Sequence, residues 1–237
     1  MFGADFAQWR KPGGWLDFFF PPLCLGCGCY SESPDFICER CRNRIDVFVH
    51  PICLTCGQMI DHGHRCDLCR EDALMLFAHG NYRDPLKEII IQFKFKGITS
   101  PAESVAEAVA ERFGERLALF GETRLIPIPL YPSREYARGY NQALLFADAL
   151  SRRLQVPRDD EILYRVMRRH PQAKLHHDDR ARNIKGVFEA EKALTKEQHV
   201  ILVDDVVTTG ATVAEARRVL IAAGYQVPAV IAMAHGL

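Results

Sequence analysis

Eight of the nine cysteines of this 237-residue chain form four C-x-x-C pairs, and all of these lie between residues 24 and 69. Ten residues separate the first pair from the second, and nine separate the third from the fourth. Two C-x-x-C turns supply the four thiolates of a closed tetrahedral zinc site, which is usually structural. We therefore expect two zinc sites, whose ligands in chain order are Cys24, Cys27, Cys38 and Cys41, then Cys53, Cys56, Cys66 and Cys69.

Other uses of these cysteines fit the spacing less well. Redox dithiols do not require four copies, and iron–sulfur clusters usually have tighter, less symmetric spacing. The long cysteine-free remainder and the absence of a secretory signal disfavour a secreted disulfide framework. His62 and His64 lie close to Cys66 and are alternative ligands, although solvent-facing loop positions suit them better. Cys29 is the ninth cysteine and belongs to none of the four C-x-x-C pairs.

The composition is that of an ordinary globular protein. It is 48% hydrophobic and 25% charged, with zero formal net charge, so bulk charge favours no class of partner. The sequence contains no run of 18 consecutive apolar residues, which a transmembrane helix would require. Metal-bound thiolates predict a cytoplasmic protein, with peripheral contact at the inner membrane as a second expectation. In the aromatic segment 1–23, Phe18 to Phe20 are expected to pack on the core, with weak membrane or partner contact as the alternative.

From about Leu76 onward, strand-like and helix-like apolar patterns alternate. The expected strands cover residues 76–84 (with a turn), 125–130, 162–167, 199–207 and 226–234, and the expected helices cover 86–95, 100–117, 141–154 and 212–224. Such alternation indicates a mostly parallel sheet with helices on both faces. The predicted fold is an α/β domain over residues 76–237, preceded by a double zinc ribbon over 24–72.

Local signals refine three of these elements. Asp84 is expected to cap the helix that follows it, with Pro85 in the first helical position. Ser100 and Glu103 predict a capping box at the start of the next helix. Pro228 suggests that the last strand begins there or lies at a sheet edge.

The stretch VILVDDVVTTGAT, residues 200–212, carries the clearest functional signal. A buried strand runs into Asp204 and Asp205, and adjacent carboxylates there are costly to desolvate unless they bind something. The following T-T-G-A-T loop opens a helix, so its N–H groups and hydroxyls form an anion cradle suited to phosphate. Carboxylates suit vicinal hydroxyls or Mg²⁺. Together these groups describe a site for a ribose phosphate. A strand ending in Asp with a threonine N-cap is the plainer alternative.

This stretch resembles the phosphoribosyl pyrophosphate (PRPP) motif of type I phosphoribosyltransferases. The resemblance implies that Asp204 and Asp205 bind the ribose hydroxyls. It also implies that the 5′-phosphate is wrapped by Val207, Thr208, Thr209, Gly210, Ala211 and Thr212. Beyond this motif, the segments FFFPPLCLGCG, FKFKG, IPIPLYPSREYARGYNQA and RRHPQAKLHHDDRARNIKGVF occur in an order similar to the ComF family, from Trp15 to the end of the chain. That family is linked to DNA uptake in naturally competent bacteria.

The ComF resemblance implies which residues contact pyrophosphate. Lys94, Lys96 and Gly97 match the loop that meets it. The segment that closes over it is matched by Arg134, Arg138, Gly139, Tyr140, Asn141 and Gln142. A second family signature is matched by Gln172, Leu175, Arg180, Arg182, Asn183, Gly186 and Phe188. Lys and Arg suit such an anion, and residues 124–185 contain 13 Lys and Arg against 7 Asp and Glu. A solvated surface is the alternative for any one of these cations.

The resemblance implies displacement at the anomeric carbon of PRPP, with pyrophosphate as the leaving group and Mg²⁺ present. Lys94, Arg138, Asp204 and Asp205 are then the expected catalytic residues. The sequence indicates no acceptor pocket and no general base. Two alternatives therefore stay open. One is a non-catalytic, PRPP-responsive protein that engages single-stranded DNA or a DNA-uptake helicase, and the other is a nucleobase salvage phosphoribosyltransferase with an added ribbon.

Overall fold

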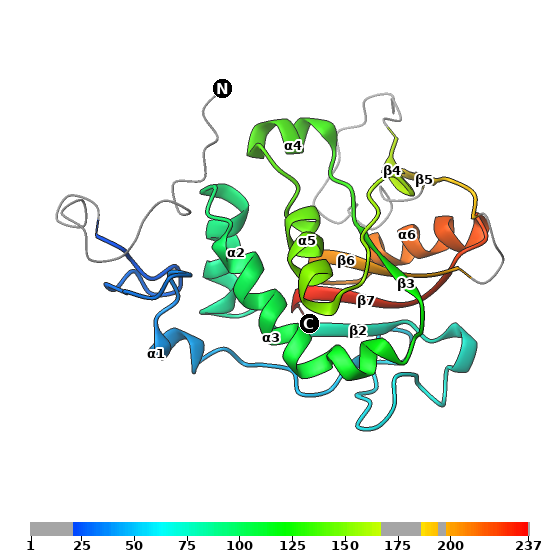
Figure 1. Ribbon diagram of the computed structural model, residues 1–237, viewed down its shortest axis with the longest axis horizontal. Helices are drawn as coiled ribbons and strands as arrows, with labels where there is room; N and C mark the ends of the chain where they lie inside the picture. The colour runs from blue at the N-terminus through cyan, green and yellow to red at the C-terminus, as the bar shows by residue number, and fades with distance from the viewer. Residues whose placement is uncertain (1–20, 167–185, 194–197, 237) are drawn as a thin grey trace.

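A five-stranded sheet forms the centre of the computed structural model, which describes residues 21–166, 186–193 and 198–236 (Figure 1). The strand order is β1-β2-β7-β6-β3. The strands are β1 (Ile52–Cys53), β2 (Met75–Asn81), β3 (Thr123–Pro127), β6 (His199–Val207) and β7 (Gln226–His235). The pairs β2–β7, β7–β6 and β6–β3 are parallel, whereas β1 is antiparallel to β2. The prediction of a mostly parallel sheet is confirmed.

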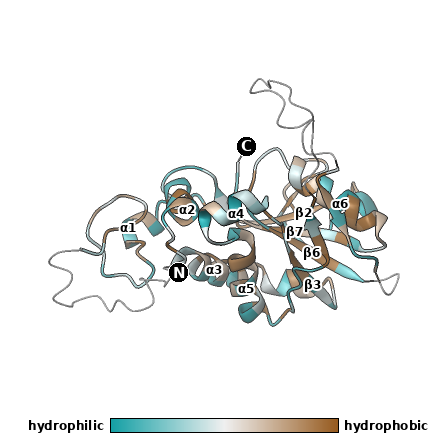
Figure 2. Cartoon of the chain, turned by 90° about the horizontal axis from the view of Figure 1, so that it is seen from above, coloured by the Kyte–Doolittle hydropathy of each residue, from teal (hydrophilic) through white to brown (hydrophobic). Residues whose placement is uncertain are grey.

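Helices cover both faces of this sheet, as predicted. They are α1 (Glu39–Arg42), α2 (Leu86–Phe95), α3 (Ser100–Ala118), α4 (Pro132–Arg138), α5 (Gln142–Leu154) and α6 (Ala211–Ala222), with a short 3₁₀ helix, η2 (Arg70–Asp72). Figure 2, seen from above, shows α3 and α5 on one side of the apolar strands and α6 on the other. The residues of α3 that recur every four positions, Val105, Val109, Phe113 and Leu117, are all buried in the core beneath it. No helix in the described ranges is long and apolar enough to cross a bilayer.

Packing against the first cysteine segment overrides both predicted helix caps. Pro85, not Asp84, is the N-cap residue of α2, and no side chain caps the helix. Pro85 is buried beside Gly26, where an added Cβ would lie 3.0 Å from the Cβ of Pro85. Ser100 is already the first residue of α3, and its hydroxyl lies 3.4 Å from the carbonyl oxygen of Asp35. The start of each helix is therefore fixed by tertiary contacts and not by the expected capping hydrogen bonds.

Pro228 does not mark a sheet edge, because β7 is the central strand. The proline is tolerated because the hydrogen-bonded ladder is interrupted there. Pairing of β7 with β2 begins only at Ala229, and the β6–β7 register shifts between His199 and Ile201. A proline at such an irregularity removes no ladder hydrogen bond.

The strand expected at residues 162–167 forms outside the main sheet. β4 (Leu163–Arg165) pairs antiparallel with β5 (Phe188–Ala190) in a separate two-stranded ribbon. The β4–β5 ribbon lies near β3, and β5 contacts α6 (Figure 1).

Candidate functional site

The eight paired cysteines gather into two clusters of four, in the predicted combinations. Within each cluster the four Sγ atoms all lie within 4.8 Å of one another. The Sγ atoms of Cys27 and Cys38 are 3.7 Å apart, as are those of Cys56 and Cys66. A tetrahedron with Zn–S bonds of about 2.3 Å has S···S edges of about 3.8 Å, so both clusters fit structural zinc.

Backbone donors favour the thiolate form of Cys24, one of the ligands of the first cluster. Burial raises the pKa of the Cys24 thiol, but hydrogen bonds from backbone N–H groups outweigh burial and lower that pKa to about 6. The N–H groups of Gly26 and Cys38 donate to Cys24 Sγ at 3.4 and 3.3 Å. His64 belongs to neither cluster, and its ring packs edge-on against Phe120. Within the described residues neither cluster includes Cys29.

The acidic pair lies near the carboxyl end of β6, where ligands of parallel α/β sheets bind. Asp205 is buried, and its Oδ1 forms an ion pair of 3.0 Å with Lys94 Nζ, near the end of α2. The Lys94 side chain is only 18% exposed. This contact unites two segments that the sequence separates widely.

Asp204 has a strongly perturbed carboxyl group. Burial and the neighbouring Asp205 charge raise its pKa to about 7, against the smaller opposing effects of the Asp205 N–H, Lys94 and Arg165. The Asp205 N–H donates to Asp204 Oδ1 at 2.8 Å. Among the described residues the charged form of Asp204 is therefore disfavoured, and a bound cation or hydroxyl group would stabilise it.

The loop after β6 has the shape of an anion cradle. Gly210 adopts a left-handed conformation with φ of 72° and directly precedes α6. Thr208 and Thr209 are exposed. The base of the loop is fixed at Val207, whose carbonyl accepts from the Gly236 N–H at 2.9 Å and lies 2.8 Å from His235 Nδ1. The first N–H groups of α6, of which that of Ala211 lies 3.5 Å from Thr209 Oγ1, are thus presented beside a rigid strand end.

The remaining predicted cations occupy different settings. Lys96 is exposed at the C-cap of α2, and Gly97 follows with φ of 69°. Arg134 is exposed on α4, with its guanidinium 5.9 Å from the ring centroid of Tyr131. Arg138 donates to Gln142 Oε1 at 2.7 Å. Of the second family signature, Gln172, Leu175, Arg180, Arg182 and Asn183 lie outside the described residues, as do Phe18 to Phe20.

Arg165 is a site residue that the sequence did not indicate. Its guanidinium lies 3.7 Å from the ring centroid of Tyr131 and 4.9 Å from that of Phe188, and it donates to the Pro129 carbonyl at 3.2 Å. Its charge also acts on Asp204. Only the β4–β5 pairing and the loop after β3 bring these groups together, so no local pattern could have revealed them.

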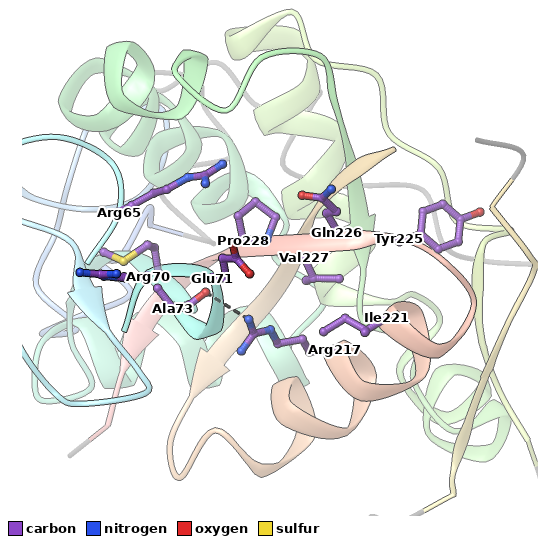
Figure 3. A pocket seen from close by; sticks show the side chains of 11 residues that line it. Arg65, Arg70, Glu71, Ala73, Arg217, Ile221, Tyr225, Gln226, Val227 and Pro228 are labelled. Carbon is purple, nitrogen blue, oxygen red and sulfur yellow. Dashed lines mark hydrogen bonds between the residues drawn. The ribbon is translucent and has the colours of Figure 1, made fainter. Parts of the chain in front are cut away.

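Two hollows lie along α6. One, of about 500 Å³, is lined by Thr209, Gly210 and Ala211 of the loop after β6 and by Leu54 and Thr55 of the second cysteine segment. The other, of about 460 Å³, lies near the amino end of β7 and is shown in Figure 3. The second hollow lies at the amino end of the parallel strands, opposite the carboxyl end at which Asp204 and Asp205 lie, so it is not part of the acidic site.

Comparison with known proteins identifies both parts of the chain. The family model described as "Double zinc ribbon domain" matches residues 15–70, and "Phosphoribosyl transferase domain" matches residues 141–236. Competence protein F of Haemophilus influenzae is 32% identical over 215 residues, which cover 85% of this chain and 92% of the relative. DNA utilization protein YhgH of Escherichia coli K12 is 32% identical over 211 residues, 85% of each chain. Competence protein ComFC of Bacillus subtilis is 27% identical over 206 residues, 79% of each chain.

Proposed function

This chain belongs to the ComF family of competence and DNA-utilization proteins, and from that premise we propose that it binds PRPP with Mg²⁺ at the carboxyl end of β6. The observation that carries the proposal is the ion pair of Lys94 with Asp205, 3.0 Å long. This ion pair brings a cation from α2 to the acidic pair, and the loop of residues 207–212 begins two residues after Asp205. Cation, carboxylates and anion cradle are the three chemistries that a ribose phosphate bearing pyrophosphate requires.

Each group has a role suited to its chemistry. The N–H groups and hydroxyls of residues 207–212 take the 5′-phosphate. Asp204 and Asp205 accept from the ribose hydroxyls, and their hard carboxylate oxygens are also suitable ligands for Mg²⁺. Bound Mg²⁺ would neutralise pyrophosphate charge. Lys94, Lys96 and Gly97, together with Arg134 and Arg138, form the side that meets pyrophosphate.

For an enzyme, the reaction is a substitution at the ribose anomeric carbon. The bond from this carbon to the pyrophosphate oxygen breaks, pyrophosphate leaves with the electron pair, and a bond to an acceptor nitrogen forms. Lys94 and Arg138 would stabilise the charge that develops on the leaving group. The acidic pair would hold the ribose while positive charge develops at its ring.

Pyrophosphate release tests turnover. The protein is incubated with PRPP, Mg²⁺ and each common nucleobase, and released pyrophosphate is measured. Release that disappears in Asp204→Asn but persists in Asp160→Asn, an exposed control on the surface, supports the enzyme. Release specific to one common base would instead favour a salvage enzyme. PRPP binding without release under any condition would contradict catalysis.

The relatives' names favour a role in handling incoming DNA, and we extend that role to this chain. Direct contact with single-stranded DNA is tested by fluorescence anisotropy, in which affinity should fall steeply with salt if phosphates are bound. No binding at low salt would exclude direct contact and leave a protein partner, such as a DNA-uptake helicase. A cytoplasmic location, with peripheral contact at the inner membrane, remains a prediction.

A PRPP-responsive binding protein is the second candidate, favoured by how the cysteine clusters are attached. Ile89 of α2, the helix that carries Lys94, packs with Cys24 and Cys41 of the first cluster. Arg217 of α6, the helix that follows the phosphate loop, donates to backbone carbonyls of the second cysteine segment. Each zinc ribbon thus contacts a helix of the ligand site. Such contacts suit a protein in which ligand binding changes the position of the ribbons and so their contact with a partner.

A further inference from the structure

Tyr140 contacts the residue immediately before Lys94. Its hydroxyl donates to the carbonyl oxygen of Phe93, and its ring lies 6.0 Å from the Phe93 ring, centroid to centroid. Phe93 is in the last turn of α2. The last four carbonyls of a helix lack intrahelical partners, so this hydroxyl satisfies a group that would otherwise depend on water.

Arg138 contacts the residue immediately after Lys94. Its guanidinium lies 5.0 Å from the ring centroid of Phe95 and donates to Gln142 Oε1 at 2.7 Å. Phe95 is 64% exposed even with this contact. The segment Arg138–Gln142 therefore contacts α2 on both sides of Lys94.

The same segment is fixed to the sheet. Gly139, with φ of 81°, ends α4 in a left-handed conformation and allows the chain to turn toward α5. Asn141 caps α5 by accepting from the Ala143 N–H at 3.0 Å, and its Nδ2 donates to the Ile128 carbonyl at 3.1 Å. Ile128 directly follows β3, whose parallel neighbour β6 carries Asp205. The segment Arg138–Gln142 thus links the end of α2 to β3 and, through it, to β6, which carries the acidic pair.

We propose that Tyr140 is a positioning residue, which fixes the last turn of α2 so that the Lys94 ammonium stays at Asp205. The ligand-binding consequence rests on the proposed PRPP site, whereas the positioning of Lys94 does not. Lys94 has a long flexible side chain on a helix end, where fraying is ordinary, so an external hydrogen bond to its neighbour restricts it. Tyr140 acts through Lys94 and needs no contact with PRPP.

The first test is a double-mutant cycle on PRPP affinity, measured calorimetrically with Mg²⁺. Tyr140→Phe should weaken binding about fivefold, the effect of one net hydrogen bond. Tyr136→Phe is the matched control, because Tyr136 lies on the adjacent helix α4 and is 93% exposed. In a Lys94→Gln background, Tyr140→Phe should cause no further loss. Equal losses in both backgrounds, or no loss in the single variant, would overturn the proposal.

A ligand-free measurement separates this inference from the proposed function. Lys94 acetylation by an N-hydroxysuccinimide ester is followed by peptide mass spectrometry in the full-length protein. Tyr140→Phe should accelerate modification of Lys94 about fivefold, while exposed Lys87 reacts at an unchanged rate and Tyr136→Phe has no effect. An unchanged Lys94 rate in Tyr140→Phe would refute positioning. If the wild type does not bind PRPP, the proposed function fails and this result still decides the role of Tyr140.

Discussion

The two zinc ribbons have the same set of ligands but are joined to the α/β domain in different ways. Cys24 and Cys41 of the first ribbon form a small separate cluster with Ile37 and Ile89. Cys53 and Cys66 of the second ribbon belong to the main core of the domain. β1 of the second ribbon also extends the main sheet, with Cys53 paired to Met75 of β2.

The polar contacts of the two ribbons show the same contrast. The first ribbon is held at Asp35, which accepts hydrogen bonds from Ser33 at 2.5 Å and from Ser104 of α3 at 2.6 Å. The second is held by Arg217, whose guanidinium donates to the carbonyl of Asp72 at 3.0 Å and to that of Ala73 at 3.2 Å. Figure 3 shows the bond to Ala73. The same four-cysteine pattern therefore forms a separate small module in the first ribbon and part of the main core in the second. The contacts around each ribbon, and not its ligands, determine how it is attached.

The largest expected effect comes from removing one ligand of each cluster. Cys66→Ser should lose the second zinc and destabilise the whole domain by at least ~3 kcal/mol, because that cysteine is part of the main core. Cys24→Ser should lose the first zinc while the main thermal transition moves little. Metal analysis together with calorimetry measures both quantities. Similar destabilisation by the two variants would show that the two ribbons contribute equally to the stability of the domain.

Arg217→Ala should destabilise the domain by about 2 kcal/mol, since two carbonyls lose a charged donor. Arg153→Ala is the control, because Arg153 is exposed and pairs with the exposed Glu107 on the surface. A surface pair of this kind contributes about 0–1 kcal/mol. Equal denaturation midpoints for the two variants would show that Arg217 does not join the ribbon to α6.

Asp204→Asn should stabilise the fold while abolishing ligand binding. The folded-state pKa of about 7 exceeds the unfolded value, so the folded protein retains this proton between about pH 4 and 7. Wild-type stability therefore declines through that range as pH rises. The variant should gain about 1–2 kcal/mol at pH 7.5 and nothing near pH 4. Urea denaturation at both values measures this, and a gain independent of pH would point to another cause.

The smallest effect is expected for Asp35→Asn, the contact that holds the first ribbon. Hydrogen bonds from Ser104 and Ser33, with the Arg42 charge, outweigh burial and lower the pKa of Asp35. Its stabilising contribution is therefore present above about pH 4 and is lost as pH falls through the lowered pKa. At pH 7.5 the variant should change the global transition by about 1 kcal/mol or less but speed proteolysis within residues 21–44. Unchanged proteolysis would contradict the role of Asp35.

Patterns confined to short stretches predicted much of this molecule. The C-x-x-C pairs, the alternating elements and the strand carrying Asp204 and Asp205 could all be located from sequence, because each depends on neighbours along the chain. The caps at Asp84 and Ser100 were wrong, because contacts with the first ribbon decide those helix starts. Arg165 and the different attachment of the ribbons depend on contacts between distant segments, which no local pattern contains.

The most direct test of the central claim is calorimetric titration of the zinc-loaded, full-length protein with PRPP in the presence of Mg²⁺. We predict one ligand per chain, and an affinity reduced at least about 100-fold in Asp205→Asn, which removes the carboxylate that pairs with Lys94. The variant should retain both zinc ions. Absence of binding to the wild type, or equal affinity in Asp205→Asn, would contradict a PRPP site at the end of β6.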